Sequence, residues 1–209
     1  MMMPYVGKNF RKAGTPALLL IGESHYWQKG STQNPSAETW YAGNSSTLSQ
    51  PEIEWFNTAE IFREARELRF LKSNAYRIWK NALWEINEYG PRYADYTCVA
   101  DDIAFYNFFL RPGIYGESLA VVPQDVQLAN DAFAMHFETL KPSAVFFLSI
   151  LAHKHFRPPE TCSIPVDATP HPGCKWWNTT MRKYGDRKGR DILADFVRGL
   201  NWPQSVAPA

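Results

Sequence analysis

Four short apolar runs divide the chain and predict four strands. The first, Pro16–Ile21, is unbroken, which is typical of a strand in a parallel sheet that is covered on both faces. The others lie at 103–109, 144–148 and 164–166. We therefore expect a small sheet whose strands are far apart in the sequence.

Apolar residues at helical spacing predict the helices that connect these strands. Asn57, followed by Glu60 three positions later, resembles a capping box and marks the start of one helix. A second helix is expected from about Ser73 to Tyr89, where Gly and Pro end it. The remaining helices are expected from Asp125 to Leu140, around Leu151 and over 192–200.

The order of these elements predicts an α/β fold, namely a three-layer α/β/α sandwich with a small, mostly parallel four-stranded sheet. Residues 1–209 are interpreted as one domain, with its core at about 16–200 and a frayed tail at 203–209. The segment 28–50 is rich in Gly, Ser, Thr, Asn and Gln, which indicates a long loop. Long loops in compact domains are often functional.

Composition and charge narrow the class of protein only modestly. The chain has 209 residues, 45% of them hydrophobic, which is enough to bury one sizeable core. A net charge of +1 gives no overall attraction to nucleic acid or membranes. The three widely spaced cysteines argue for free thiols, and no apolar run has the length of a signal peptide or a membrane span. We expect a soluble cytoplasmic monomer.

The charge is nevertheless uneven. Between 150 and 190 there are eight Lys or Arg residues against three acids. This excess fits either a surface that follows a phosphate backbone or a solvated basic face.

Three polar clusters interrupt apolar surroundings where chemistry is expected. Gly22-Glu23-Ser24-His25-Tyr26 follows the first strand, Asn107 lies within the second, and His171-Pro172-Gly173 follows the fourth. In open α/β sheets, ligands bind beyond the carboxyl ends of the strands. A buried amide such as that of Asn107 must be satisfied or used. The sequence therefore predicts one site at this edge of the sheet.

In their order and spacing, these clusters resemble the motifs of the uracil-DNA glycosylase superfamily. That family has a motif beginning Gly-Glu or Gly-Gln after the first strand, an Asn at the end of a later strand, and a late His-Pro-Ser loop. The resemblance covers nearly the whole domain, from Leu18 to Leu200, and only the ordered set of motifs is specific. It implies a DNA glycosylase that flips a pyrimidine or modified base out of DNA.

The residue types suit that reaction. Asn107 presents both a donor and an acceptor to a pyrimidine edge. His171 can donate to the departing base, and Glu23 can orient a water molecule or balance the charge on the sugar. The resemblance implies no metal and no other cofactor. Further base-binding candidates are Ser24, His25, Tyr26 and Tyr106, together with Trp40, Tyr41 and Phe56 as stacking aromatics.

The segment after His171 is the expected DNA-binding region. Lys175-Trp176-Trp177 can supply a wedge that fills the vacated base stack, although the two tryptophans equally fit a core. The cations expected to contact phosphate are Lys175, Arg182, Lys183, Arg187 and Lys188.

Three departures from the family pattern point to an unusual substrate. Ser24 and His25 replace the usual Asp or Asn and the usual Pro, and Gly173 replaces a Ser. The Gly-Glu branch usually holds an iron–sulfur cluster, for which this chain lacks the cysteines. We therefore expect a divergent enzyme. The base that it removes is expected to be uracil-like or a modified pyrimidine, such as glucosylated 5-hydroxymethylcytosine of phage DNA.

Two alternatives remain at this stage. Ser24, with His171 as base and Asn107 as oxyanion donor, resembles a GDSL-type serine esterase, although Glu23 does not fit that family's motif. The second alternative is a nucleic-acid-binding module without catalytic activity.

Overall fold

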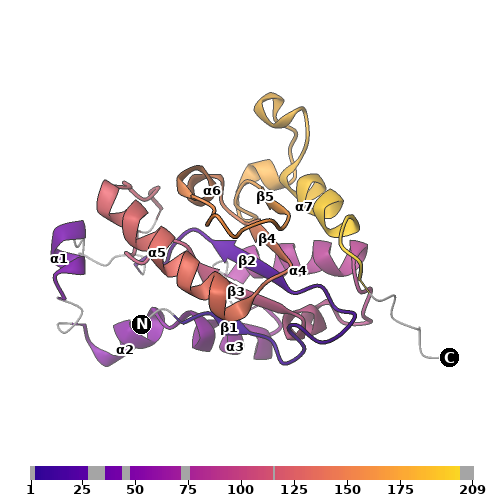
Figure 1. The fold of residues 1–209 in the computed structure, drawn as a ribbon, viewed down its shortest axis with the longest axis horizontal. Coiled ribbons are helices and arrows are strands. Elements are labelled where there is room, and N and C mark those ends of the chain that lie inside the picture. The colour runs from indigo at the N-terminus through magenta and orange to yellow at the C-terminus, as the bar shows by residue number, and fades with distance from the viewer. Residues whose placement is uncertain (1–2, 28–35, 44–47, 72–75, 115, 203–209) are drawn as a thin grey trace.

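The chain forms an α/β protein with a five-stranded, mostly parallel mixed sheet flanked by helices (Figure 1). The computed structural model describes residues 3–27, 36–43, 48–71, 76–114 and 116–202. The strand order is β1-β3-β2-β4-β5, in which only β1 is antiparallel to its neighbour. The strands are β1 (Tyr5–Val6), β2 (Leu18–Gly22), β3 (Ile103–Asn107), β4 (Ala144–Phe147) and β5 (Val166–Ala168).

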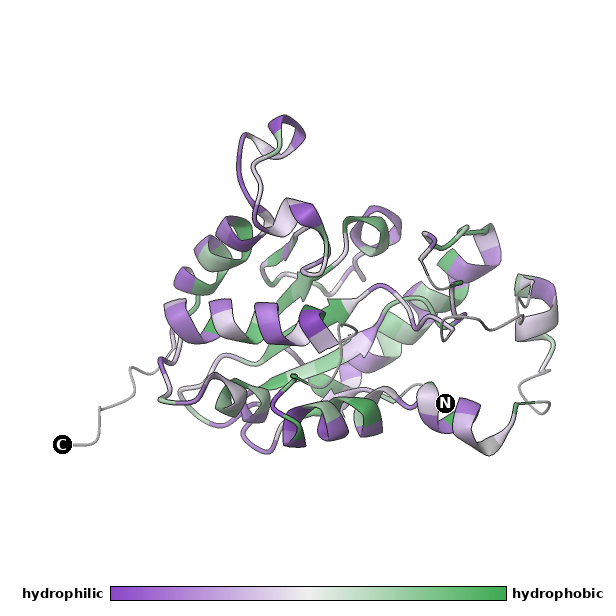
Figure 2. Ribbon diagram, turned by 180° about the vertical axis from the view of Figure 1, so that it is seen from behind, coloured by the Kyte–Doolittle hydropathy of each residue, from purple (hydrophilic) through white to green (hydrophobic). Residues whose placement is uncertain are grey.

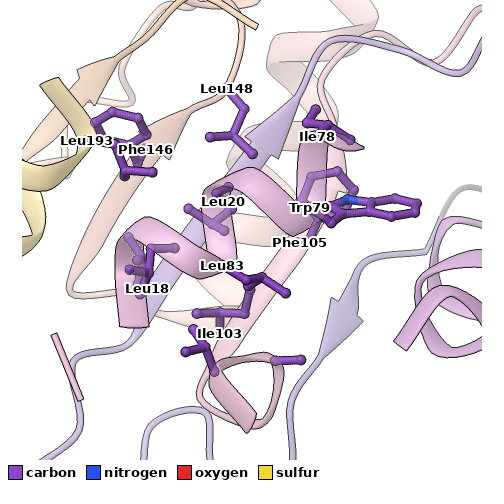
Figure 3. Packing of buried hydrophobic residues seen from close by; sticks show 14 of the residues in the cluster. Leu18, Leu20, Ile78, Trp79, Leu83, Ile103, Phe105, Phe146, Leu148 and Leu193 are labelled. Atoms are coloured by element: carbon purple, nitrogen blue, oxygen red, sulfur yellow. The ribbon is translucent and has the colours of Figure 1, made fainter. Parts of the chain in front are cut away.

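Alternate residues of the central strands enter two separate cores. Leu18 and Leu20 of β2 face one core, whereas Leu19 and Ile21 face the other. Because both sets are buried, the strand is apolar throughout rather than alternating. Figure 3 shows the first core, where β2, β3 and β4 pack against α4 and α7.

Helices cover both faces of the sheet. The first core is closed by α3 (Thr58–Glu67), α4 (Arg77–Tyr89) and α7 (Gly189–Arg198), and the second by α5 (Pro123–Leu140) and α6 (Ile150–His155). Two short helices, α1 (Ala37–Tyr41) and α2 (Gln50–Trp55), lie to one side in Figure 1. Short 3-10 helices form at Tyr96–Asp101, Lys175–Trp177 and Arg182–Tyr184.

The structure corrects the predicted sheet in two places. It has five strands rather than four, because Tyr5–Val6 pairs with Phe105 and Ala104. Two residues are too few to show the alternation of apolar and polar positions that predicts a strand. The ring of Tyr5 is held by stacking on Phe62, with the ring centroids 4.2 Å apart. The last strand is Val166–Ala168 rather than 164–166. In the register observed, Val145 pairs with Val166 and Phe147 with Ala168.

The helices agree better with their predicted positions. The side chain of Asn57 accepts a hydrogen bond from the backbone N–H of Glu60 at 3.3 Å, as expected for an N-cap. Part of the predicted loop 28–50 is helical, since α1 lies within it. Residues Ser73 and 203–209, where a helix start and a tail were expected, lie outside the described residues. No helix in the described part of the chain is long and apolar enough to cross a membrane.

Candidate functional site at the carboxyl edge of the sheet

Four neighbouring parallel strands each deliver one polar residue to the same edge of the sheet. Asn107 ends β3, Glu23 follows β2, Ser149 follows β4, and His171 follows β5. The strands are in register at this edge, because Gly22 pairs with Asn107 and Ile21 with Phe147. The tertiary structure thus brings three predicted residues and one unpredicted residue to one edge.

The carboxylate of Glu23 is held by two hydroxyl groups. The hydroxyl of Tyr26 donates to Oε1, and the hydroxyl of Ser149 donates to Oε2 at 2.5 Å. Burial, reinforced by the charge of Glu23, raises the pKa of Tyr26, so Tyr26 stays a protonated donor. Glu23 is therefore fixed in orientation while remaining half-exposed at the edge.

The side chain of Asn107 lies directly over Gly22. A Cβ atom at position 22 would be 2.2 Å from Oδ1 of Asn107, so only glycine leaves room for the amide. Asn107 is 6% exposed, yet within the described residues its side-chain amide makes no hydrogen bond. The amide atoms of Asn107 are not among the enclosed polar atoms that lack a partner, so they stay open at the edge of the sheet, where a ligand can bind them.

His171 is arranged as a neutral hydrogen-bond donor. Its Nδ1 accepts from the backbone N–H of Gly173 at 3.0 Å, so the neutral ring carries its proton on Nε2. The residue keeps access to solvent, but the surrounding protein lowers the pKa of the imidazole by desolvation, against the opposing charge of Glu23. The backbone carbonyl of Pro172 accepts from Nδ2 of Asn81 on α4 at 2.7 Å, which positions the loop.

The side chains of Ser24 and His25 are bound to neighbouring segments of the protein. The hydroxyl of Ser24 donates to the carbonyl of Arg111 at 2.6 Å. The Nε2 of His25 lies 2.7 Å from Oγ1 of Thr58, and burial lowers the pKa of His25 to about 4. Both side chains fasten the loop after β2 to neighbouring segments, and these contacts occupy the polar groups that were expected to bind the base.

Most of the aromatic candidates are engaged elsewhere. Tyr106 is 0% exposed and packs edge-on against His136 beneath α5, so it has no surface to offer a base. Phe56 is buried in a small cluster with Trp27, against which Trp40 packs. The indole of Trp40 donates to the carbonyl of Leu110 at 3.0 Å.

Tyr41 also has a structural contact. Its hydroxyl donates to Oδ1 of Asp125 at 2.8 Å, and burial, followed by this hydrogen bond, raises its pKa. Among the predicted aromatic residues, Tyr26 is the one whose side chain is hydrogen-bonded in the described structure to one of the four edge residues, Glu23.

The predicted DNA-binding segment separates into core and surface. Trp177 is 3% exposed and belongs to the first core, so it is not a wedge. Trp176 is half-buried, with the ammonium group of Lys175 4.2 Å from its ring centroid. Arg187 is paired with Asp195 of α7, whereas Arg182 and Lys183 are exposed. Lys188 is half-buried at the N-cap of α7.

Sequence reasoning missed Ser149 and Asn81. Ser149 directly follows a predicted strand, so the rule that selected Glu23 selects it as well. Asn81 lies on the polar side of a helix and carries no such signal.

In the described ranges, no group of three or more His, Cys, Asp or Glu residues is arranged to hold a metal ion. Comparison of the chain with protein-family models and with curated proteins finds no match.

Proposed function

We propose that this protein is a DNA glycosylase that flips a uracil-like or modified pyrimidine out of DNA and hydrolyses its N-glycosidic bond. The observation that carries the proposal is the amide of Asn107, which has no hydrogen-bond partner in the described residues, stays open at the edge and lies beside Glu23, where His171 also lies. An amide offers one acceptor and two donors, which matches the edge of a pyrimidine. The helices on both faces of the sheet are consistent with the sandwich of the uracil-DNA glycosylase superfamily.

His171 supports the bond-breaking step. When the C–N bond breaks, its electron pair leaves with the base and negative charge develops on the base carbonyl oxygen. The Nε2–H of a neutral imidazole can donate a hydrogen bond to that oxygen and so stabilise its negative charge. The lowered pKa and the bond from Gly173 both favour this state of the ring.

Glu23 supports the attack of water. The bond cleavage leaves an oxocarbenium-like sugar, which a carboxylate stabilises by charge. The two hydroxyls that bind Glu23 hold it in one orientation, so it can also accept a proton from a water molecule that adds to the sugar.

The position of Trp55 supports a base larger than uracil. The indole of Trp55 donates to the backbone carbonyl of Tyr26 at 2.8 Å, so the end of α2 is attached directly to a residue that contacts Glu23. A glucosylated 5-hydroxymethylcytosine is therefore included among the proposed substrates. Residues 28–35 and 44–47, which belong to the same predicted loop, lie outside the described residues.

The geometry does not favour the esterase alternative. The hydroxyl of Ser24 donates to a backbone carbonyl, and the Nδ1 of His171 is occupied by Gly173. A serine nucleophile needs a hydrogen bond to its base, and the base needs a carboxylate on its other nitrogen.

The test is an alkali-cleavage assay on labelled oligonucleotides carrying uracil, hypoxanthine, 5-hydroxymethylcytosine or its glucosylated form. We expect strand breaks at one base, lost in both Asn107→Ala and His171→Ala. Matched controls are Asn201→Ala and His153→Ala, which change the same residue types elsewhere and are expected to retain cleavage. Absence of breaks at every base would contradict the proposal and favour a binding module without activity.

A further inference from the structure

A narrow arm, Asn178–Lys188, stands out from the body of the protein (Figures 1 and 2). It follows the 3-10 turn Lys175–Trp177 and returns to the start of α7. Asn178, Thr179 and Thr180 are exposed, as is Arg182. These exposed side chains bury little surface and contribute little to folding, which suggests that they contact another molecule.

The arm is ordered by its own backbone. Met181 and Arg187 form an antiparallel bridge, and the N–H of Asp186 donates to the carbonyl of Met181 at 3.1 Å. Gly185 takes the left-handed conformation with φ of 67°, which closes the turn at its tip. The tip therefore has a defined shape.

The root of the arm is fastened next to the candidate site. The hydroxyl of Thr169 donates to the carbonyl of Gly189 at 2.7 Å, and Thr169 lies two residues before His171. A Cβ atom at Gly189 would be 2.8 Å from that hydroxyl and 3.2 Å from the ring of Trp177. Arg187 pairs with Asp195 of α7 and so anchors the part of the arm that leads back to α7. These contacts at the base of the arm fix its orientation relative to the candidate site.

The free charge of the arm is positive. Arg182 and Lys183 at its tip are exposed and, within the described residues, form no ion pair with a carboxylate. Asp186 is the single acid in Asn178–Lys188. The ammonium group of Lys183 lies 4.8 Å from the ring centroid of Tyr184. Tyr184 is half-buried and packs against the first core, so the tip presents charge rather than an exposed aromatic face on which a base can stack.

We propose that this arm binds the phosphate backbone of duplex DNA beside the target base, so that duplex rather than single-stranded DNA is the substrate. Binding to single strands relies on aromatic stacking platforms, which the arm lacks. Duplex DNA carries a dense array of phosphates along a rigid path, which suits exposed cations on a rigid element. The inference rests on the proposed function for the identity of the site, but its test reads binding separately from base removal.

The experiment measures binding of a labelled duplex of about 30 base pairs by fluorescence anisotropy across a salt series. The variant is Arg182→Ala/Lys183→Ala. The matched control, Arg11→Ala/Lys12→Ala, removes the same two charges from exposed positions next to the amino ends of β2 and β3, opposite the site. We expect the variant to reduce the slope of log K against log salt by about 2, and the control to leave it unchanged.

This change in slope means that the variant loses about tenfold less affinity than the wild type between 50 and 200 mM salt. An unchanged slope in the variant, or an equal loss in the control, would overturn the role of the arm. Tighter binding of a single strand than of the duplex would overturn duplex preference. An arm-dependent slope without base release would uphold the arm and contradict the glycosylase, whereas base release with an unchanged slope would do the reverse.

Discussion

At the scale of single residues, Asn107 depends on the missing side chain at position 22. The added methyl group of Gly22→Ala would meet Oδ1 of Asn107 at 2.2 Å and Cζ of Phe105 at 3.0 Å. The amide must then move, and a misplacement of about 1 Å costs roughly a hundredfold in rate. We expect Gly22→Ala to lower kcat/KM for base release by that factor. Gly199→Ala is the control, because Gly199 has an ordinary helical φ of −71° far from the edge. Full activity in Gly22→Ala would contradict the role given to Asn107.

His25 predicts a pH dependence of stability at the same scale. Burial lowers its pKa to about 4 from an ordinary value of about 6.5, so the unfolded chain binds this proton first as the pH falls. The stabilising effect of the neutral ring is complete above about pH 6.5 and is lost towards pH 4. Between pH 7 and 4.5 the loss is about 2 kcal/mol. Between pH 7 and 4.5, we expect the free energy of unfolding of His25→Gln, measured with urea, to fall by about 2 kcal/mol less than that of the wild type. Parallel pH curves for the two proteins would show that His25 does not cause the pH dependence.

At the scale of elements, helix α4 holds the loop of His171 through one hydrogen bond. Nδ2 of Asn81 donates to the carbonyl of Pro172. We expect Asn81→Ala to lower kcat about tenfold, with stability reduced by about 1 kcal/mol, because a single hydrogen bond is lost. Asn87→Ala on the same helix is the control. It loses contacts with the backbone of Tyr93 and should destabilise the fold while retaining kcat. Equal kcat values in the two variants would show that the bond from Asn81 does not position the loop.

The whole molecule is held together at one side by a buried ion pair. Arg111, in the loop after β3, donates two bonds to Asp125 of α5, and Tyr41 of α1 donates a third. The guanidinium and carboxylate are only 9% and 0% exposed. Asp125→Ala would leave the charge of Arg111 buried and unpaired.

We expect Asp125→Ala to lower the free energy of unfolding by about 3–5 kcal/mol. Tyr41→Phe should cost only about 1 kcal/mol, since the ion pair remains. Denaturant titration of both variants measures the difference. Similar losses in the two would mean that the ion pair is solvated in solution.

Local sequence patterns predict most of the secondary structure and direct attention to the carboxyl edge of the sheet. Unbroken apolar runs require burial on both faces, so the three long strands were found from their composition. Helical periods located α3, α4, α5 and α7, because each buries one face of a helix. The rule that ligands bind at carboxyl ends selected Glu23, Asn107 and His171 from single strands.

Which side chains meet depends on the arrangement of the strands and helices in space. Ser149 reaches Glu23 across 126 positions because β4 lies beside β2, and no local pattern encodes that adjacency. Trp177 and Tyr106 are core residues because α7 and α5 cover them. The pairing of Tyr5–Val6 likewise depends on the side of β3 that β2 does not occupy. Periodicity reports which face of an element is buried, whereas the partners across that face are set by the order of the strands.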